Sequence, residues 1–176
     1  MAKKFLSLWL LLVAGHLASA QVIKEDVWFR IVPGHSRQPL EIQGGVTGNE
    51  DGLPLRQSAS TNATGGGNQL FQFQRVRGGY YKIFVQQSRK VLEVKDASLE
   101  LHALIEQGAD HGADNQLFAL VKHADGAFQI VGKNSGFGLD VFKDAVIQYQ
   151  MYGNANQTFR LEPVKTESPA APANHL

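Results

Sequence analysis

The sequence contains no cysteine. Disulfide bonds, zinc–thiolate sites and cysteine nucleophiles are therefore excluded, and a domain of this chain must be held together by its hydrophobic core. An excess of charge of one sign is also lacking, since the chain has 17 lysines and arginines, 16 acidic residues and no block of basic residues. A chain with this charge pattern is not expected to bind nucleic acid or an anionic membrane through electrostatic attraction.

Long hydrophobic runs are scarce, and the clearest one stands near the start of the chain. Residues 5–13 are apolar, follow Lys3 and Lys4, and precede the small residues Ala18, Ser19 and Ala20. The run is too short to span a bilayer, so this pattern predicts a cleavable signal peptide over residues 1–20. We therefore expect a secreted protein, either extracellular or periplasmic. Removal of the two lysines would lower the formal net charge from +1 to −1.

Catalytic motifs are absent as well. There is no Gly-x-Ser-x-Gly elbow, no phosphate-binding loop and no His-Glu-x-x-His sequence. The histidines of the mature chain, among them His102, His111 and His123, are spread along the sequence without metal-ligand spacing. The sequence therefore predicts a protein that is not an enzyme and that needs no metal or cofactor.

Helical patterns of ten or more residues are missing, and apolar residues instead alternate with a period of two. Such alternation is typical of β-strands with one buried face. Glycine, asparagine, aspartate and proline cluster between the alternating segments and mark turns. About four short strands per unit, or twelve in all, are expected. The alternating sets are Val27, Phe29 and Ile31; Leu99, Leu101 and Ala103; and Ile147, Tyr149 and Met151.

Three markers recur in the same order three times along the chain. An aromatic residue in an aliphatic setting opens each unit, a leucine–acid–aliphatic segment follows, and an Asn-Gln-x-Phe motif closes it. Repetition of this kind predicts three equivalent units that bury their apolar faces against one another. The closing motifs are Asn68-Gln69-Leu70-Phe71, Asn115-Gln116-Leu117-Phe118 and Asn156-Gln157-Thr158-Phe159, and the acidic segments begin at Leu40, Leu92 and Leu139.

These repeats resemble the ricin-type (ricin B) lectin family, whose units each carry a Gln-x-Trp motif. Here Phe71, Phe118 and Phe159 replace the tryptophan. The resemblance implies an all-β protein, a β-trefoil of three pseudo-equivalent four-stranded units over residues 21–164. Residues 165–176, rich in alanine and proline without apolar periodicity, are expected to form a disordered tail.

The same resemblance implies where sugars would bind. A pocket of this family uses the acid of the middle marker, an aromatic ring on the third strand, and the asparagine before the glutamine. A carboxylate and an amide can bridge neighbouring hydroxyls of a sugar, and an aromatic ring stacks on its C–H face. In the third unit Asp140 and Asn156 stand at these positions, with Tyr149 or Gln148 as the third partner. Strict alternation would turn Tyr149 inward beside Ile147 and leave Gln148 facing the pocket.

The other two units match the pattern less well. The second unit offers Glu93 and Asn115, with His102 as a substitute for the aromatic ring. The first unit offers Glu41 and Asn68. The glutamines of the closing motifs are expected to hold backbone groups at the strand entries, and the phenylalanines are expected to lie in the core.

The sequence therefore predicts a secreted, non-catalytic carbohydrate-binding module with at most one or two working pockets, whose partners are glycans or glycoconjugates. Two alternatives stay open at this point. One is a protein-binding β-trefoil, similar to a protease inhibitor, that acts through loops such as residues 57–67. The other is a scaffold whose sugar sites have decayed.

Overall fold

A computed structural model of the chain describes residues 23–58 and 66–164. The predicted signal peptide and tail lie outside the described residues, as does most of the 57–67 loop. Within the described part, the helices are five 3-10 turns of three residues each. None of these helices is long and apolar enough to cross a membrane.

Twelve strands form the fold over residues 23–58 and 66–164, four from each unit, as the sequence predicts. The first unit holds β1 (Trp28–Pro33), β2 (Leu40–Ile42), β3 (Leu53–Gln57) and β4 (Phe71–Arg75). The second holds β5 (Tyr81–Val85), β6 (Val91–Val94), β7 (Ile105–Gly108) and β8 (Phe118–Lys122). The third holds β9 (Phe128–Gly132), β10 (Gly138–Phe142), β11 (Ala145–Tyr149) and β12 (Phe159–Val164). The predicted all-β fold is confirmed.

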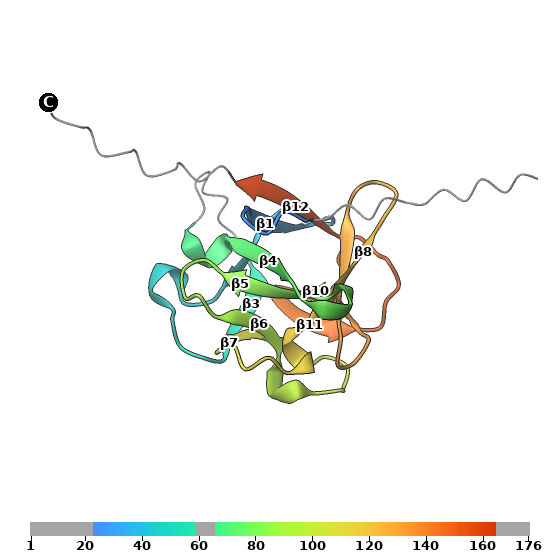
Figure 1. Cartoon of the computed structure of the whole chain (residues 1–176). Coiled ribbons are helices and arrows are strands. Elements are labelled where there is room, and N and C mark those ends of the chain that lie inside the picture. The colour runs from blue at the N-terminus through green and yellow to red at the C-terminus, as the bar shows by residue number, and fades with distance from the viewer. Residues whose placement is uncertain (1–22, 59–65, 165–176) are drawn as a thin grey trace, which may run out of the picture.

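The first and last strands of the three units close into a six-stranded barrel. Antiparallel pairing runs from β1 to β4, β5, β8, β9 and β12 and returns to β1. The first and last strands of the chain therefore lie side by side (Figure 1). The phenylalanine of each closing motif stands opposite the opening aromatic of its own unit: Phe71 opposite Phe29, Phe118 opposite Tyr81, and Phe159 opposite Phe128.

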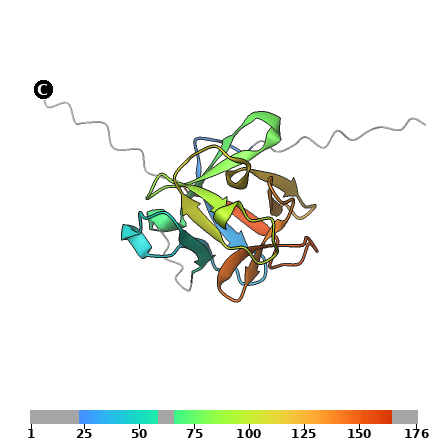
Figure 2. The same cartoon turned by 90° about the horizontal axis from the view of Figure 1, so that it is seen from below.

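The second and third strands of each unit form a hairpin, and the three hairpins contact one another. Leu53 of β3 pairs with Gln107 of β7, and Ala145 of β11 pairs with Arg56 of β3. A bridge between Leu104 and Ile147 completes the circle. Seen from below, segments from all parts of the chain surround the middle of the molecule (Figure 2). A barrel capped by three hairpins is the β-trefoil that the repeats predict.

The core confirms the predicted role of the three phenylalanines. Phe71, Phe118 and Phe159 are fully buried together with Phe73, which meets Phe29 edge to face at 5.8 Å between ring centroids. Burial of apolar side chains and edge-to-face aromatic pairs both stabilise such a core in the absence of disulfides.

Two details of the predicted alternation are wrong. Leu99 and Leu101 are exposed in a turn, and β7 begins only at Ile105, because the backbone takes left-handed φ angles in this segment, for example 69° at His102. In β11, Val146 lies in the core, whereas Ile147 and Tyr149 lie on the opposite face. The predicted register of β11 is therefore inverted, and this inversion decides which side chains reach the candidate site.

Candidate functional site

The glutamine of each closing motif ties a turn to the acid of its unit. In the third unit, Gln157 Oε1 accepts hydrogen bonds from the backbone N–H groups of Tyr152 and Gly153. Its Nε2 donates to the carbonyl of Gln150 and to Asp140 Oδ2, both at 2.8 Å. Gln116 makes the same four bonds in the second unit, and its acidic partner is Glu93. These glutamines are structural, as the sequence suggests, and they also orient the acids.

The acid of the third unit differs from the other two in its second partner. Asn156 Nδ2 donates to Asp140 Oδ1 at 2.9 Å, so the two carboxylate oxygens each accept a bond from an amide. The equivalent Asn68 and Asn115 donate instead to the backbone carbonyls of Ile42 and Val94. Asp140 and Asn156 therefore form one polar unit, so the structure brings these two predicted site residues together.

The residue opposite the acid on the third strand also changes from unit to unit. Glu41 faces Arg56 across the β2–β3 hairpin, and the two side chains form an ion pair at 2.9 Å. Glu93 faces Glu106, which pairs with Lys95 at 3.1 Å. In the third unit the opposite residue is the apolar Ile147. Only there does the acid stand beside a neutral surface.

Ion pairing in the first unit changes the acidity of its carboxyl group. Partial burial raises the pKa of Glu41, but side-chain hydrogen bonds from Gln69, Ser58 and Arg56, together with the positive charge of the arginine, outweigh that effect. The pKa of this group therefore lies below its ordinary value. The carboxylate that a sugar would need in the first unit is already engaged by the protein's own groups.

The aromatic position distinguishes the third unit again. Tyr149 pairs with Gly138, and the corresponding residue of β7 is Gly108, which pairs with Val91. A side chain at Gly108 would collide with the carboxylate of Glu93, so that carboxylate occupies the space over the glycine. The second unit therefore fills with its own glutamate the space in which the third unit carries a tyrosine.

A cavity of about 330 Å³ opens at the acid of the third unit. Polar groups that can hydrogen-bond a ligand and aromatic rings that can stack on one are both present in its wall. Its lining residues are His102, Asp140, Phe142, Ile147, Tyr149, Tyr152, Asn154, Asn156 and Gln157. Asp140, Asn156 and Tyr149 are thus brought together where the sequence places a sugar pocket.

His102 belongs to this cavity and not to the second unit, which corrects its predicted position. The turn that carries it lies along β11, because its backbone N–H donates to the carbonyl of Gln148 at 2.9 Å. The imidazole stacks on Tyr149 at 4.9 Å between ring centroids and 17° between planes. Contact between neighbouring hairpins thus moves a residue of one unit into the pocket of the next. The equivalent contact to β7 is made by Gly52, whose N–H donates to Gln107.

Gln148 lies outside the cavity, which corrects the alternative that places it there. The side chain is 1% exposed. Its Nε2 donates to the carbonyls of Ser98 and Glu100, and its Oε1 accepts from Ser135 Oγ. Gln107 holds the turn of the first unit in the same way, because its Nε2 donates to the carbonyls of Gly48 and Glu50. The amide of Gln148 is therefore used to fix the turn that carries His102.

The remaining predicted residues, Glu93 and Asn115, do lie together in the second unit. Glu93 Oε2 accepts from Gln116 and lies 3.2 Å from His111 Nε2. Sequence reasoning missed Phe142, Ile147 and Asn154 as pocket residues. Phe142 stands two positions after Asp140 on one strand, a spacing that places both side chains on the same face and could have revealed it.

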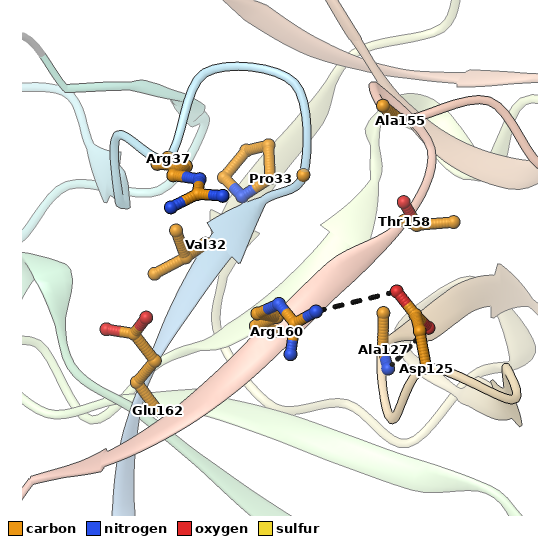
Figure 3. A pocket seen from close by; sticks show the side chains of 10 residues that line it. Val32, Pro33, Arg37, Asp125, Ala127, Ala155, Thr158, Arg160 and Glu162 are labelled. Carbon is orange, nitrogen blue, oxygen red and sulfur yellow. Dashed lines mark hydrogen bonds and ion pairs between the residues drawn. The ribbon is translucent and has the colours of Figure 1, made fainter.

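A second hollow of about 390 Å³ is lined by residues of β1, of β12 and of the segments before β9 and β12 (Figure 3). Two arginines and two acids line it together with Thr158, and Arg160 points toward Asp125 at 3.5 Å. Its four charges balance, and no aromatic ring is among its lining residues. This hollow therefore lacks the stacking surface that a sugar pocket of this kind uses. Among the described residues, no group of three or more metal-ligating side chains is gathered at one place.

Comparison with known proteins gives matches of family and of structure. The family described as "Ricin-type beta-trefoil lectin domain-like" matches residues 67–146. The crystal structure of the designed threefold-symmetric protein ThreeFoil is 32% identical with a TM-score of 0.73, and the match covers 78% of this chain and 99% of that protein. A search of curated proteins gives no match.

Two further structures share the fold. The exo-β-1,3-galactanase 1,3Gal43A from Clostridium thermocellum is 25% identical with a TM-score of 0.72; the match covers 81% of this chain and 31% of the enzyme. The present chain thus spans about a third of that enzyme. A Polyporus squamosus lectin, bound to a sialylated trisaccharide, is 14% identical with a TM-score of 0.65 over 80% of this chain and 50% of the lectin. At that identity the likeness shows the fold alone.

Proposed function

The chain belongs to the ricin-type β-trefoil lectin domain-like family, and we propose that it is a secreted, non-catalytic module that binds a glycan through one pocket, in its third unit. The observation that carries this proposal is the combination of Asp140, an apolar neighbour at Ile147 and an aromatic ring at Tyr149 in one cavity. The first and second units each lack at least two of these three features.

The chemistry of the cavity suits a pyranose. An ionised carboxylate offers about four lone-pair directions, and the two amide donors at Asp140 use only part of them. The remaining directions can accept hydrogen bonds from neighbouring sugar hydroxyls, while Asn154 and Asn156 supply further polar groups. The apolar C–H face of the sugar would pack on Tyr149, which buries apolar area at low cost in side-chain entropy.

The other two units are proposed not to bind sugar. Arg56 neutralises Glu41 in the first unit, and a sugar would have to break that ion pair. Glu93 lies over Gly108 in the second unit, in the space a stacked sugar and its aromatic platform would need. We therefore propose that one chain binds one sugar chain.

The first ligands to test are galactose and its β-1,3-linked oligosaccharides, because the similar 1,3Gal43A is an exo-β-1,3-galactanase. A glycan array with the wild type and the Asp140→Ala variant tests the site. Glu93→Gln is the matched control, since it changes the equivalent acid of the second unit. The proposal expects binding that Asp140→Ala removes and Glu93→Gln leaves intact. Absence of binding to any glycan, or equal binding by the wild type and Asp140→Ala, would overturn it.

A further inference from the structure

We propose that the site at Asp140 holds two adjoining sugar subsites, one on Tyr149 and the second on Phe142, which lines the same cavity. The ligand is then an oligosaccharide of at least two residues and not a single sugar. This inference rests on the proposed function and adds to it the length of ligand that the site recognises.

The strand register places the two aromatic rings at opposite ends of one surface. Along the outward face of the β10–β11 hairpin, Gly138 pairs with Tyr149, Asp140 with Ile147, and Phe142 with Ala145. Residues two apart on a strand are separated by about 7 Å. Asp140 therefore stands between two aromatic platforms, with Tyr149 toward one end and Phe142 toward the turn. A carboxylate in this place can accept hydrogen bonds from hydroxyl groups of either of two linked sugars.

Phe142 is a large apolar residue that lies outside the core. Its side chain is 60% exposed, although the neighbouring Val141 is part of the core. The corresponding positions, two residues after the acid, are Gln43 in the first unit and Lys95 in the second. An exposed aromatic ring in the wall of a polar cavity offers a stacking surface to a ligand. The aromatic ring at this position is therefore confined to the unit that carries the pocket.

A donor is available next to this second platform. Lys143 Nζ lies 5.7 Å from the centroid of the Phe142 ring. It makes no ion pair with any of the residues that the structure describes. The ammonium group covers part of one ring face and leaves the rest of the ring to a sugar, whose hydroxyls it can meet as a donor. Phe142 and Lys143 thus combine an aromatic ring with a hydrogen-bond donor.

The other end of the surface is already occupied. His102 covers one face of Tyr149, and the Tyr152 ring lies 6.3 Å from Tyr149 at 53°. A ligand that packs against the remaining surface of Tyr149 can extend over Asp140 toward Phe142, where the ring is open. The geometry therefore favours elongation of the ligand toward the β10–β11 turn.

Calorimetric titration of galactose, β-1,3-galactobiose and β-1,3-galactotriose, and of matched mono-, di- and trisaccharides of each sugar that binds on the array, tests this inference. The wild type is expected to bind disaccharides about tenfold more tightly than the corresponding monosaccharide. Phe142→Ala should lower disaccharide affinity more than monosaccharide affinity and so reduce this advantage, and Phe142→Tyr should keep it. Val121→Ala, which shortens an exposed apolar side chain on β8, is the control and should change neither affinity.

The outcomes separate this inference from the proposed function. Equal affinity for mono- and disaccharides, or an unchanged ratio in Phe142→Ala, would overturn the second subsite while the pocket at Asp140 stands. Absence of binding to every saccharide, or binding that Asp140→Ala does not affect, would overturn both. Because Phe142 is exposed, its replacement by alanine is not expected to prevent folding, which circular dichroism checks.

Discussion

Asp140 and Ile147 face each other across the β10–β11 hairpin, so the acid of the third unit has no charged partner on the neighbouring strand. The acids of the first two units face Arg56 and Glu106 instead. In the first unit the ion pair with Arg56 satisfies the carboxylate of Glu41 with a group of the protein itself. In the second unit the carboxylate of Glu93 lies over Gly108. In the third unit the carboxylate keeps acceptor capacity for a ligand, and this difference separates a pocket from two filled sites.

Tyr149→Ala is expected to weaken glycan binding about tenfold, and Tyr149→Phe to change it less than threefold. The ring supplies the stacking surface. Stacking of a pair of aromatic rings contributes about 0.5–1.5 kcal/mol beyond the area that it buries, and we expect a similar contribution here. The hydroxyl group of Tyr149 makes no hydrogen bond to any described residue. Isothermal titration with the preferred glycan measures both variants. Equal losses in the two would contradict a stacking role for the ring.

His102→Gly is expected to separate binding from folding. A non-glycine residue held at a φ of 69° costs about 1–2 kcal/mol, and glycine removes that cost at the expense of about 0.5–1 kcal/mol of backbone entropy. Stability should therefore change by less than about 1 kcal/mol, while binding weakens because Tyr149 loses its stacked neighbour. Urea unfolding and titration measure the two effects. A large loss of stability with unchanged affinity would show that His102 serves the fold alone.

Stability should fall in acid through Glu41. The pKa of Glu41 is lowered in the folded protein from an ordinary value of 4.5. A group with a depressed folded pKa contributes stability that is present above the unfolded pKa and is lost as pH falls through the folded pKa. The free energy of unfolding should therefore decline below about pH 4.5, and less steeply in Glu41→Gln. Urea unfolding from pH 3 to pH 7 measures this, and parallel pH profiles of the two proteins would refute the assignment.

Gln116→Ala is expected to destabilise the fold without affecting glycan binding. The change leaves the N–H groups of His111 and Gly112 and the carbonyl of Ala109 without their partner. Each of these hydrogen bonds contributes about 0.5–1.5 kcal/mol to stability, so their joint loss should be measurable. Gln74→Ala, at an exposed position on β4, is the control and should change stability by less than about 0.5 kcal/mol. Similar unfolding midpoints for the two variants would contradict the structural role of Gln116.

The sequence was sufficient to predict the three units, their twelve strands and the buried phenylalanines. These features depend on local period and repetition, which a single chain displays directly. The placement of Asp140 and Asn156 near one another follows from the family resemblance. Each of these features follows from the position of a residue within its own unit.

The wrong predictions concern contacts between units. Strict alternation places Gln148 in the pocket, but Val146 takes the core position and Gln148 anchors the turn of the second unit. The sequence assigns His102 to its own unit, whereas left-handed backbone geometry and pairing along β11 carry it into the next. Such contacts join segments far apart in the sequence, so they cannot be predicted from periodicity or motif spacing.

The central claim is a single glycan site in the third unit, and the stoichiometry of binding tests it most directly. Isothermal titration of the preferred oligosaccharide into the wild-type chain is predicted to give one site per chain, and Asp140→Ala is predicted to give none. Three equivalent sites per chain, or one site that survives in Asp140→Ala, would contradict the account.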